Sequence, residues 1–109
     1  MTTAEFAMEG SRVTGFIIKD HSGFADAGED ILCAAVTSAV RLTECAVNDV
    51  LGLGAAVKVD EQRASVSLKL PRNLEGEADN VCQTLLTALM VYLVQLQEEY
   101  PENIIVMEV

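Results

Sequence analysis

Basic residues are scarce in this sequence: seven Lys and Arg stand against seventeen Asp and Glu, and the net charge is −10. Because contacts to phosphate need Lys and Arg, this balance argues against a nucleic-acid partner. It is compatible with a basic partner or substrate, and equally with a surface that only keeps the protein in solution. Tryptophan is absent, and aromatic residues make up 5% of the chain. The core must therefore be built from Val, Leu, Ile and Ala.

Long apolar runs are missing as well. No stretch approaches the roughly 18–20 uninterrupted apolar residues that a membrane span needs. The first residues, Met-Thr-Thr-Ala-Glu, lack the basic region and following apolar run of a secretory signal. We therefore expect a cytoplasmic protein without a membrane partner.

Cysteine and histidine are few: the cysteines are Cys33, Cys45 and Cys82, and the one histidine is His21. An odd cysteine count without a secretory signal argues against a disulfide framework. One histidine and no C-x-x-C pair leave no zinc-site spacing, so we expect neither a metal nor another cofactor. At least one thiol should be free, and the question is which of the three is reactive.

The chain of 109 residues can bury one core, and no repeat or linker divides it, so we expect a single domain over residues 1–109. Hydrophobic periodicity predicts strands at 5–7, 13–19, 55–59, 65–70 and 103–109, helices at 30–51 and 77–98, and a loop at 20–28. This order predicts an α+β fold with two helices packed on one face of a mixed or antiparallel sheet. The strand order stays open, a ferredoxin-like arrangement included.

Each predicted helix has one apolar face. In the first helix this face comprises Leu32, Ala35, Val36, Ala39, Val40, Ala46, Val47 and Val50, with Arg41, Glu44 and Asp49 on the other side. In the second helix it comprises Val81, Leu85, Leu89, Tyr92, Leu93 and Leu96. Asp30 is the expected N-cap of the first helix, and Gly52 and Gly54 end it.

Cys33 is the thiol best placed for reactivity. A nucleophilic thiol needs exposure, a lowered pKa and a base within hydrogen-bond reach. If Asp30 caps the helix, Cys33 falls on its first turn, where unpaired N–H groups and the positive end of the helix dipole stabilise a thiolate. The same N–H groups could stabilise an oxyanion on the substrate. Cys45 lies three turns further on, and no histidine precedes Cys82 closely.

His21 is the side chain whose unperturbed pKa lies near neutrality. It follows a predicted strand, and a loop of the length that separates it from Cys33 closes at low entropic cost. Paired, the two would form a thiolate–imidazolium couple in which His21 later protonates the leaving amine. The ordinary alternatives are a solvated histidine and a cysteine that only packs in the core. Nearby carboxylates oppose the pairing, because negative charge raises a thiol pKa.

The segment 20–37 reads DHSGFADAGEDILCAAVT. It closely resembles the signature of the ribosomal-processing cysteine protease family, often called Prp, in which a His and a glycine-containing loop precede Gly-x-Asp-Ile-Val/Leu-Cys-Ala-Ala-Val-Ser. Within it, His21 matches the family's catalytic histidine and Cys33 its nucleophile. Chain length and element order agree with the family over nearly the whole sequence.

The resemblance implies a homodimeric α+β cysteine endopeptidase. Relatives in the family remove the N-terminal extension of a large-subunit ribosomal protein, number twenty-seven, so the substrate would be the precursor of that protein. Cleavage follows a phenylalanine-containing motif, which implies a hydrophobic pocket beside the catalytic dyad. From their residue types, Ser22, Gly23, Phe24 and Gly28 belong either to a loop that opens for a peptide and closes over it or to an ordinary surface connection.

Two positions depart from the family pattern. Asp20 stands where Gly commonly precedes the His, and it is either a third member that orients His21 or a surface residue. Thr37 stands where Ser is usual, one turn after Cys33, and its hydroxyl could bond Cys33 or the substrate. Asp30 also has two possible roles, as the helix cap or as a residue that orients His21.

Two other functions stay open from the sequence. The chain could be a non-catalytic acidic binding module, such as a ribosome-assembly factor that holds a basic ribosomal protein, with Cys33 as a packing residue. A thiol-based redox sensor is the third possibility, although no second cysteine lies close to Cys33 in the sequence to resolve its oxidised form.

Overall fold

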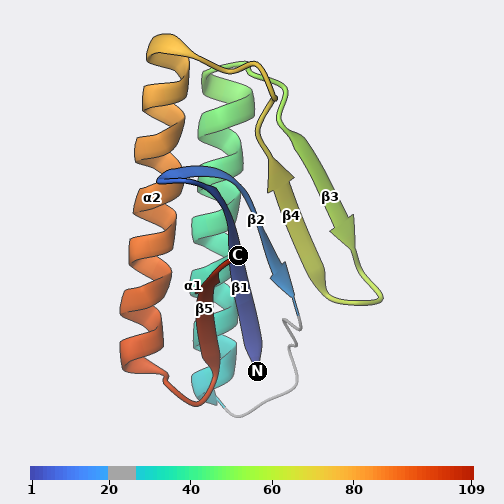
Figure 1. Cartoon of the computed structure of the whole chain (residues 1–109). Coiled ribbons are helices and arrows are strands. Elements are labelled where there is room, and N and C mark those ends of the chain that lie inside the picture. Colours follow the sequence, from blue (N-terminus) through green and yellow to red (C-terminus); the bar gives the residue numbers. More distant parts are fainter. Residues whose placement is uncertain (20–26) are drawn as a thin grey trace.

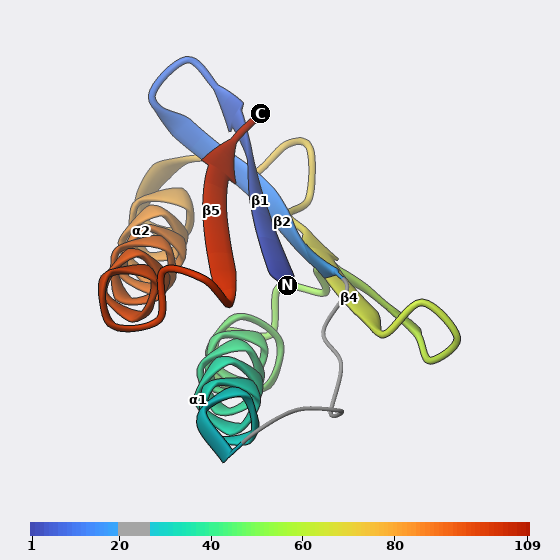
Figure 2. The same cartoon turned by 90° about the horizontal axis from the view of Figure 1, so that it is seen from below.

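A computed structural model describes residues 1–19 and 27–109, and it describes residues 27–30 as backbone only. The elements are β1 (Thr2–Glu9), β2 (Arg12–Lys19), α1 (Ala27–Glu44), a π-helix (Cys45–Val50), β3 (Ala56–Asp60), β4 (Ser65–Lys69), α2 (Gly76–Glu99) and β5 (Ile104–Glu108). Both helices lie on one face of the sheet (Figure 1, Figure 2). The predicted α+β fold and its element order are confirmed.

The five strands form one mixed sheet in the order β3-β4-β2-β1-β5. Neighbouring strands are antiparallel except β1 and β5, which are parallel. Helix α1 connects β2 to β3, and α2 connects β4 to β5. Without β1, the order β3-β4-β2-β5 is the ferredoxin-like one that the sequence left open. Strand β1 is inserted between β2 and β5.

The core lies between the sheet and the two helices. Phe6 of β1 faces Phe16 of β2 across the strand pair, and their ring centroids are 5.7 Å apart. Such tilted aromatic pairs contribute beyond their buried area. The helices cover this face with the fully or almost fully buried side chains of Leu32, Val36, Val40, Val47, Cys82, Leu86, Leu89, Leu93 and Leu96. Gly15 of β2 allows close strand approach, because a Cβ there would collide with the carbonyl oxygen of Leu68.

Strand β1 is longer than the predicted segment 5–7. Thr2, Ala4 and Phe6 point into the core, and the residues between them are half-buried. Thr2 and Thr3 favour a strand, but Ala4 and Glu5 do not, so the local signal is interrupted. Strand β1 pairs with β2 on one side and with β5 on the other, and this pairing extends the strand through the weak positions.

The apolar face of α2 matches the predicted one only in part: Leu89, Leu93 and Leu96 are buried as predicted. Val81 and Tyr92 are exposed, whereas Cys82 and Leu86 are fully buried. Apolar residues occur on both faces of this helix, so periodicity alone did not identify the face that meets the sheet. Val50 was also predicted in the core and is 75% exposed. It ends a π-helix, in which each residue turns less about the axis than in an α-helix, so the apolar stripe drifts outward.

One helical stretch, Ile31–Val50, is long and apolar enough to span a membrane by length and composition, with a mean hydropathy of 1.3. Leu32, Val36, Val40 and Val47 of this stretch belong to the core. Apolar core helices meet the same criterion, so the finding is weak support for a membrane span. The absence of a membrane partner stays a prediction.

An ion pair and hydrogen bonds connect the start of β2, in the β1–β2 hairpin, to the first turns of α2. Arg12 Nη2 lies 2.8 Å from Asp79 Oδ1, and Arg12 Nε donates to both carboxylate oxygens at 3.1 Å. Beside this pair, the Gln83 amide accepts a hydrogen bond from Val13 N and donates one to Val13 O, at 2.7 and 2.8 Å. The hydrogen bonds from Arg12 hold the pKa of Asp79 below its usual value.

This ion pair predicts a pH-dependent loss of stability. A carboxyl whose pKa is lowered by folding stabilises the fold above its unfolded pKa, about 3.9, and that stabilisation is lost as the pH falls through the folded value. We expect Asp79→Asn to lower the urea midpoint of unfolding at pH 7. The difference in midpoint between the variant and wild type should narrow as the pH falls past roughly 3.9. Asp49→Asn, at an exposed position, should match wild type at each pH. A gap that does not change with pH would contradict the role of the Asp79 charge.

Candidate functional site

Cys33 lies near the start of α1 and is half-buried. Helix α1 begins at Ala27, so Cys33 is its seventh residue and belongs to the second turn. The prediction that Cys33 lies on the first turn is therefore wrong by one turn. Its side chain still leans back toward the helix start, as side chains in α-helices do. The helix dipole acts on it less than in the first turn.

Asp30 and Gly28 also differ from their predicted places. Asp30 is the fourth residue of α1 and not its N-cap, and Gly28 is the second helical residue and not part of the loop. An acidic first turn is favourable in either case, so the pair Glu29 and Asp30 did not fix the boundary. Glycine weakens a helix by about 1 kcal/mol relative to alanine but does not prevent one, so Gly28 did not mark the end of the loop.

The other half of the predicted dyad lies outside the described residues. The structure does not describe residues 20–26, which join the end of β2 at Lys19 to the start of α1 at Ala27. This segment contains Asp20, His21, Ser22, Gly23 and Phe24. The contact between His21 and Cys33, and the roles of Asp20 and the loop, stay predictions.

An apolar groove of about 450 Å³ lies between α1 and the β3–β4 hairpin. Its apolar walls are formed by Ile18, Val36, Val40, Val59, Ala64 and Val66. Thr37 also lines it, and Thr37 follows Cys33 by four residues, which places the two on the same side of α1. The groove therefore begins within one helical turn of Cys33.

Charged side chains border this groove: Arg41 and Glu44 on α1, and Asp60 and Glu61 at the hairpin turn. Arg41 and Glu44 were assigned from the sequence to the outer side of the helix, and the hairpin was not assigned to the site at all. No local signal places the hairpin against α1. Its position follows from the sheet order, in which β3 occupies the edge.

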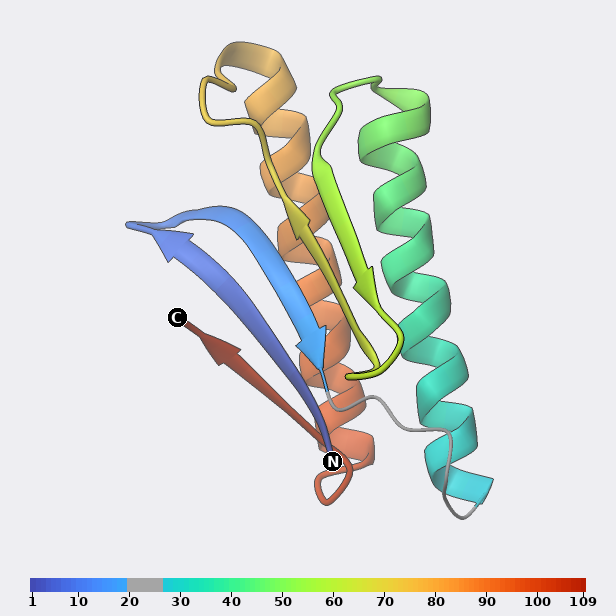
Figure 3. The same ribbon diagram turned by 90° about the vertical axis from the view of Figure 1, so that its right-hand side faces the viewer.

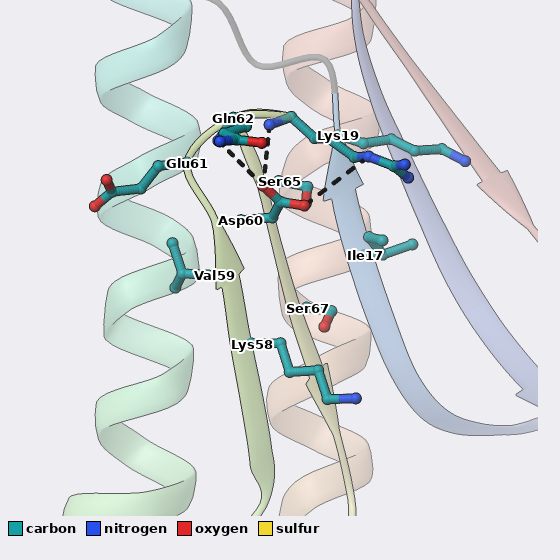
Figure 4. Close-up of a pocket in the computed structure, with 10 residues that line it drawn as sticks. Ile17, Lys19, Lys58, Val59, Asp60, Glu61, Gln62, Ser65 and Ser67 are labelled. Atoms are coloured by element: carbon teal, nitrogen blue, oxygen red, sulfur yellow. Dashed lines mark hydrogen bonds and ion pairs between the residues drawn. The ribbon is translucent and has the colours of Figure 1, made fainter.

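A second hollow lies on the opposite face of the sheet, which the helices leave open. Its volume is about 1190 Å³, and it is lined by Ile17, Lys19, Lys58, Val59, Asp60, Glu61, Gln62, Arg63, Ser65 and Ser67 (Figure 4). Asp60 closes the hairpin turn at its edge by accepting hydrogen bonds from Gln62 N and Arg63 N, at 3.1 and 3.2 Å. Small side chains on β4 keep this surface hollow.

The other two cysteines lie apart from the groove. Cys45 is exposed at the start of the π-helix, and Cys82 is fully buried on α2. Burial raises the pKa of the Cys82 thiol, nearby Asp79 raises it further, and Arg12 lowers it. Among the described residues, no cluster of three His, Cys, Asp or Glu side chains could hold a metal ion.

The cysteines should differ in their reaction with iodoacetamide. We expect Cys82 to stay unlabelled in the folded protein, because its thiol is buried and protonated. Exposed Cys45 should label at the rate of an ordinary surface thiol. Peptide mapping by mass spectrometry distinguishes the sites, and denaturant should abolish the protection of Cys82. Labelling of Cys82 as fast as Cys45 without denaturant would contradict its burial.

A family model described as cysteine protease Prp matches residues 1–105 of the chain. The chain belongs to the Prp family of cysteine proteases. The family match therefore supports the protease hypothesis over the binding module and the redox sensor, and it confirms the resemblance stated from the segment 20–37. The ribosomal processing cysteine protease Prp of Bacillus subtilis (strain 168) is 28% identical over 92 residues, which cover 84% of this chain and 82% of that protein.

Solved structures share the Prp fold over the whole chain. The essential ribosomal processing protease Prp from S. aureus, solved in complex with a substrate peptide, superposes with a TM-score of 0.84 at 21% identity, and all of both chains is covered. SMU.848 from Streptococcus mutans superposes with a TM-score of 0.87 at 22% identity, covering 99% of this chain and 93% of that one. These similarities establish the fold.

Proposed function

We propose that this Prp-family protease removes the N-terminal extension of large-subunit ribosomal protein number twenty-seven, with Cys33 as nucleophile and His21 as base. The observation that carries the proposal is the position of Cys33, one turn from an apolar groove, in a chain that matches the family over nearly its whole length. The Bacillus subtilis relative named as a ribosomal processing protease supports the substrate class.

The dyad would act by covalent catalysis. His21 takes the thiol proton, the Cys33 Sγ attacks the scissile carbonyl carbon, and the C–N bond breaks as the imidazolium gives its proton to the leaving amine. Water then attacks the thioester with His21 as base, which releases the new carboxyl terminus and restores the thiol. In each step His21 passes on the proton that it takes: the thiol proton goes to the leaving amine, and a proton from water restores the thiol.

His21 would supply most of the activation of Cys33. The thiol lies in the second turn of α1, where the stabilisation of a thiolate by the helix dipole has already weakened. The carboxylates that precede Cys33 in the sequence would oppose ionisation of the thiol, so the proposal needs a cation close to Sγ. In this proposal the imidazolium is that cation, Asp20 or Asp30 orients its ring, and the Thr37 hydroxyl holds the substrate backbone.

The apolar groove is the place for the phenylalanine of the cleavage motif. Six apolar side chains form its walls, and about 450 Å³ exceeds what one aromatic ring needs. Because the groove begins one turn from Cys33, a phenylalanine held in it would bring the adjacent peptide bonds to the thiol. Small pocket residues such as Ala64 leave room for a large side chain.

The net charge of −10 favours a basic ribosomal protein as partner, since opposite charge speeds encounter. We further propose that the enzyme acts in the cytoplasm and as a homodimer. The exposed apolar residues of the helix layer, Leu42 and Tyr92 among them, give a surface that a second copy could cover.

A peptide assay tests the proposal. The protein is mixed with a synthetic peptide that carries the phenylalanine-containing extension of the ribosomal protein, and products are identified by mass spectrometry. We expect one cut, directly after the phenylalanine-containing motif. An intact peptide, under conditions in which the Bacillus subtilis relative cuts it, would refute the proposed substrate.

A further inference from the structure

Strand β3 is an edge strand with a free outer edge. It stands at the end of the sheet order, and it pairs with β4 on its inner side. Within the part of the chain that the structure describes, no strand pairs with its outer side (Figure 3). Ala56, Lys58, Val59 and Asp60 are exposed, Val59 at 67%. An exposed edge presents unpaired N–H and C=O groups, which can accept another extended chain.

The two hollows lie on either side of this edge. Val59 pairs with Val66, and both line the apolar groove beside α1. Lys58 pairs with Ser67, and both line the hollow on the open face (Figure 4). Successive residues of a strand point to opposite faces. A chain added along β3 would therefore send alternate side chains into the groove and into the hollow.

We propose that the substrate peptide binds as an added strand along the free edge of β3. The inference rests on the proposed function, because it takes the cleaved peptide as the occupant. Main-chain hydrogen bonds to β3 supply affinity, and the two hollows select alternate side chains, as in other peptide-binding sheets. The peptide is extended, and its phenylalanine points into the apolar groove.

The open-face hollow selects a polar or acidic side chain. Three of the seven basic residues, Lys19, Lys58 and Arg63, line this hollow beside two carboxylates, Asp60 and Glu61, in a chain whose net charge is −10. Lys19 Nζ forms an ion pair with Glu5 Oε2 at 3.0 Å, and Arg63 Nε lies 3.9 Å from Asp60 Oδ2. Lys58 makes no ion pair with any carboxylate of the described residues. The peptide residue opposite Lys58 is therefore best acidic, because opposite charges on facing strands attract.

The edge leads toward Cys33. Strand β3 runs to the hairpin turn at Asp60, and Asp60, Glu61 and Ala64 line the apolar groove together with Thr37. Thr37 is one turn from Cys33. The end of β3 and Thr37 thus border the same groove, so a strand added to β3 would approach the nucleophile at this end. The other edge strand, β5, borders α2 and not α1, so it provides a control.

Backbone methylation of the peptide tests strand addition directly. Each amide of the cleavage peptide is N-methylated in turn, and binding to the Cys33→Ala protein is measured by calorimetry. In an added strand, every second N–H points to β3, so methylation should weaken binding at alternate positions only. Each of these losses should be about fivefold or more, the effect of one main-chain hydrogen bond. Losses without a two-residue period would overturn the proposal.

Amide hydrogen exchange identifies which edge strand the peptide binds. On peptide binding, amides of β3 should gain protection, while amides of β5 should not. Protection on β5 and not on β3 would place the peptide at the wrong edge for this inference.

Charge exchange at Lys58 tests the side-chain selection. Lys58→Glu should weaken binding of a peptide with Glu opposite Lys58 by about two- to fivefold, and a Lys at that peptide position should restore it. Lys69→Glu is the matched control, since Lys69 lies on the same face of β4 but outside the hollow. Equal effects of the two variants would show a general charge effect and contradict specific pairing.

The outcomes separate this inference from the function on which it rests. If the wild-type protein cuts the peptide but methylation shows no period, strand addition is wrong and the protease assignment stands. If the protein neither binds nor cuts the peptide, the proposed substrate is wrong, and this inference fails with it.

Discussion

Cys33→Ala should lower kcat for the cleavage peptide by roughly 10⁴-fold or more, because the variant has no atom that can form the thioester. The thiol is the one group in the proposed cycle that makes and breaks a covalent bond to substrate. Rates are measured with the same peptide over a range of concentrations that reaches saturation, so that kcat and KM are separated. KM should change little, since the apolar groove is unaltered.

Cys45→Ala and Cys82→Ala are the matched controls. Cys45 is exposed and far along the helix from Cys33, and Cys82 packs on α2. Both variants should keep kcat within about twofold of wild type, as expected for residues outside the reacting groups. Cys82→Ala leaves a small cavity, so its assay is run well below its unfolding temperature. A comparable loss in either control, or residual cleavage by Cys33→Ala near the wild-type rate, would refute the role of Cys33.

His21→Ala should lower kcat by roughly 10²- to 10⁴-fold, the usual contribution of a general base. It should also slow alkylation of Cys33 at pH 6, because the imidazolium would no longer stabilise the thiolate. This labelling is a readout that misfolding alone would not produce, since an unfolded chain would expose Cys82 as well. An unchanged rate of Cys33 alkylation would show that His21 does not stabilise the Cys33 thiolate.

The sequence selected the candidate catalytic residues from one local pattern, and it predicted the structure around Cys33 less well. The signature lies within eighteen consecutive residues, 20–37, so a local pattern was enough to select Cys33 and to propose His21. The start of α1 was wrong by one turn, because Glu29 and Asp30 suit a cap and a first turn alike. That error made the expected effect of the helix dipole on Cys33 too large.

The apolar groove could not be predicted from local patterns. Val40 and Val66 form it together, and twenty-five residues separate them along the chain, from position 41 to position 65. Their meeting depends on the sheet order, which places β3 and β4 beyond β2 and under α1. Element type follows from periodicity within a segment, but strand order depends on contacts between segments. The family resemblance implied a hydrophobic pocket and did not say which residues form it.

Local periodicity also did not identify the buried face of α2, and variants of two adjacent leucines test which face is buried. Leu86 is fully buried against the sheet. Leu85 is half-buried and lines a separate groove between α1 and α2, together with Ala39 and Tyr92. The sequence placed Leu85 in the core and did not select Leu86. We expect Leu86→Ala to cost about 2–5 kcal/mol of unfolding free energy, a large part of the roughly 5–15 kcal/mol that holds a domain together.

Leu85→Ala should cost about 1 kcal/mol, because it removes apolar contacts on one side only and leaves no enclosed cavity. Both changes have the same effect on helix propensity, so the difference between them reports burial. Urea unfolding at pH 7, followed by circular dichroism, measures both free energies, and unchanged m-values would show that the unfolded states are comparable. Equal losses, or a greater loss for Leu85→Ala, would mean that α2 is rotated toward the face that includes Val81 and Tyr92. The Cys82 thiol would then be accessible, and its resistance to alkylation would disappear as well.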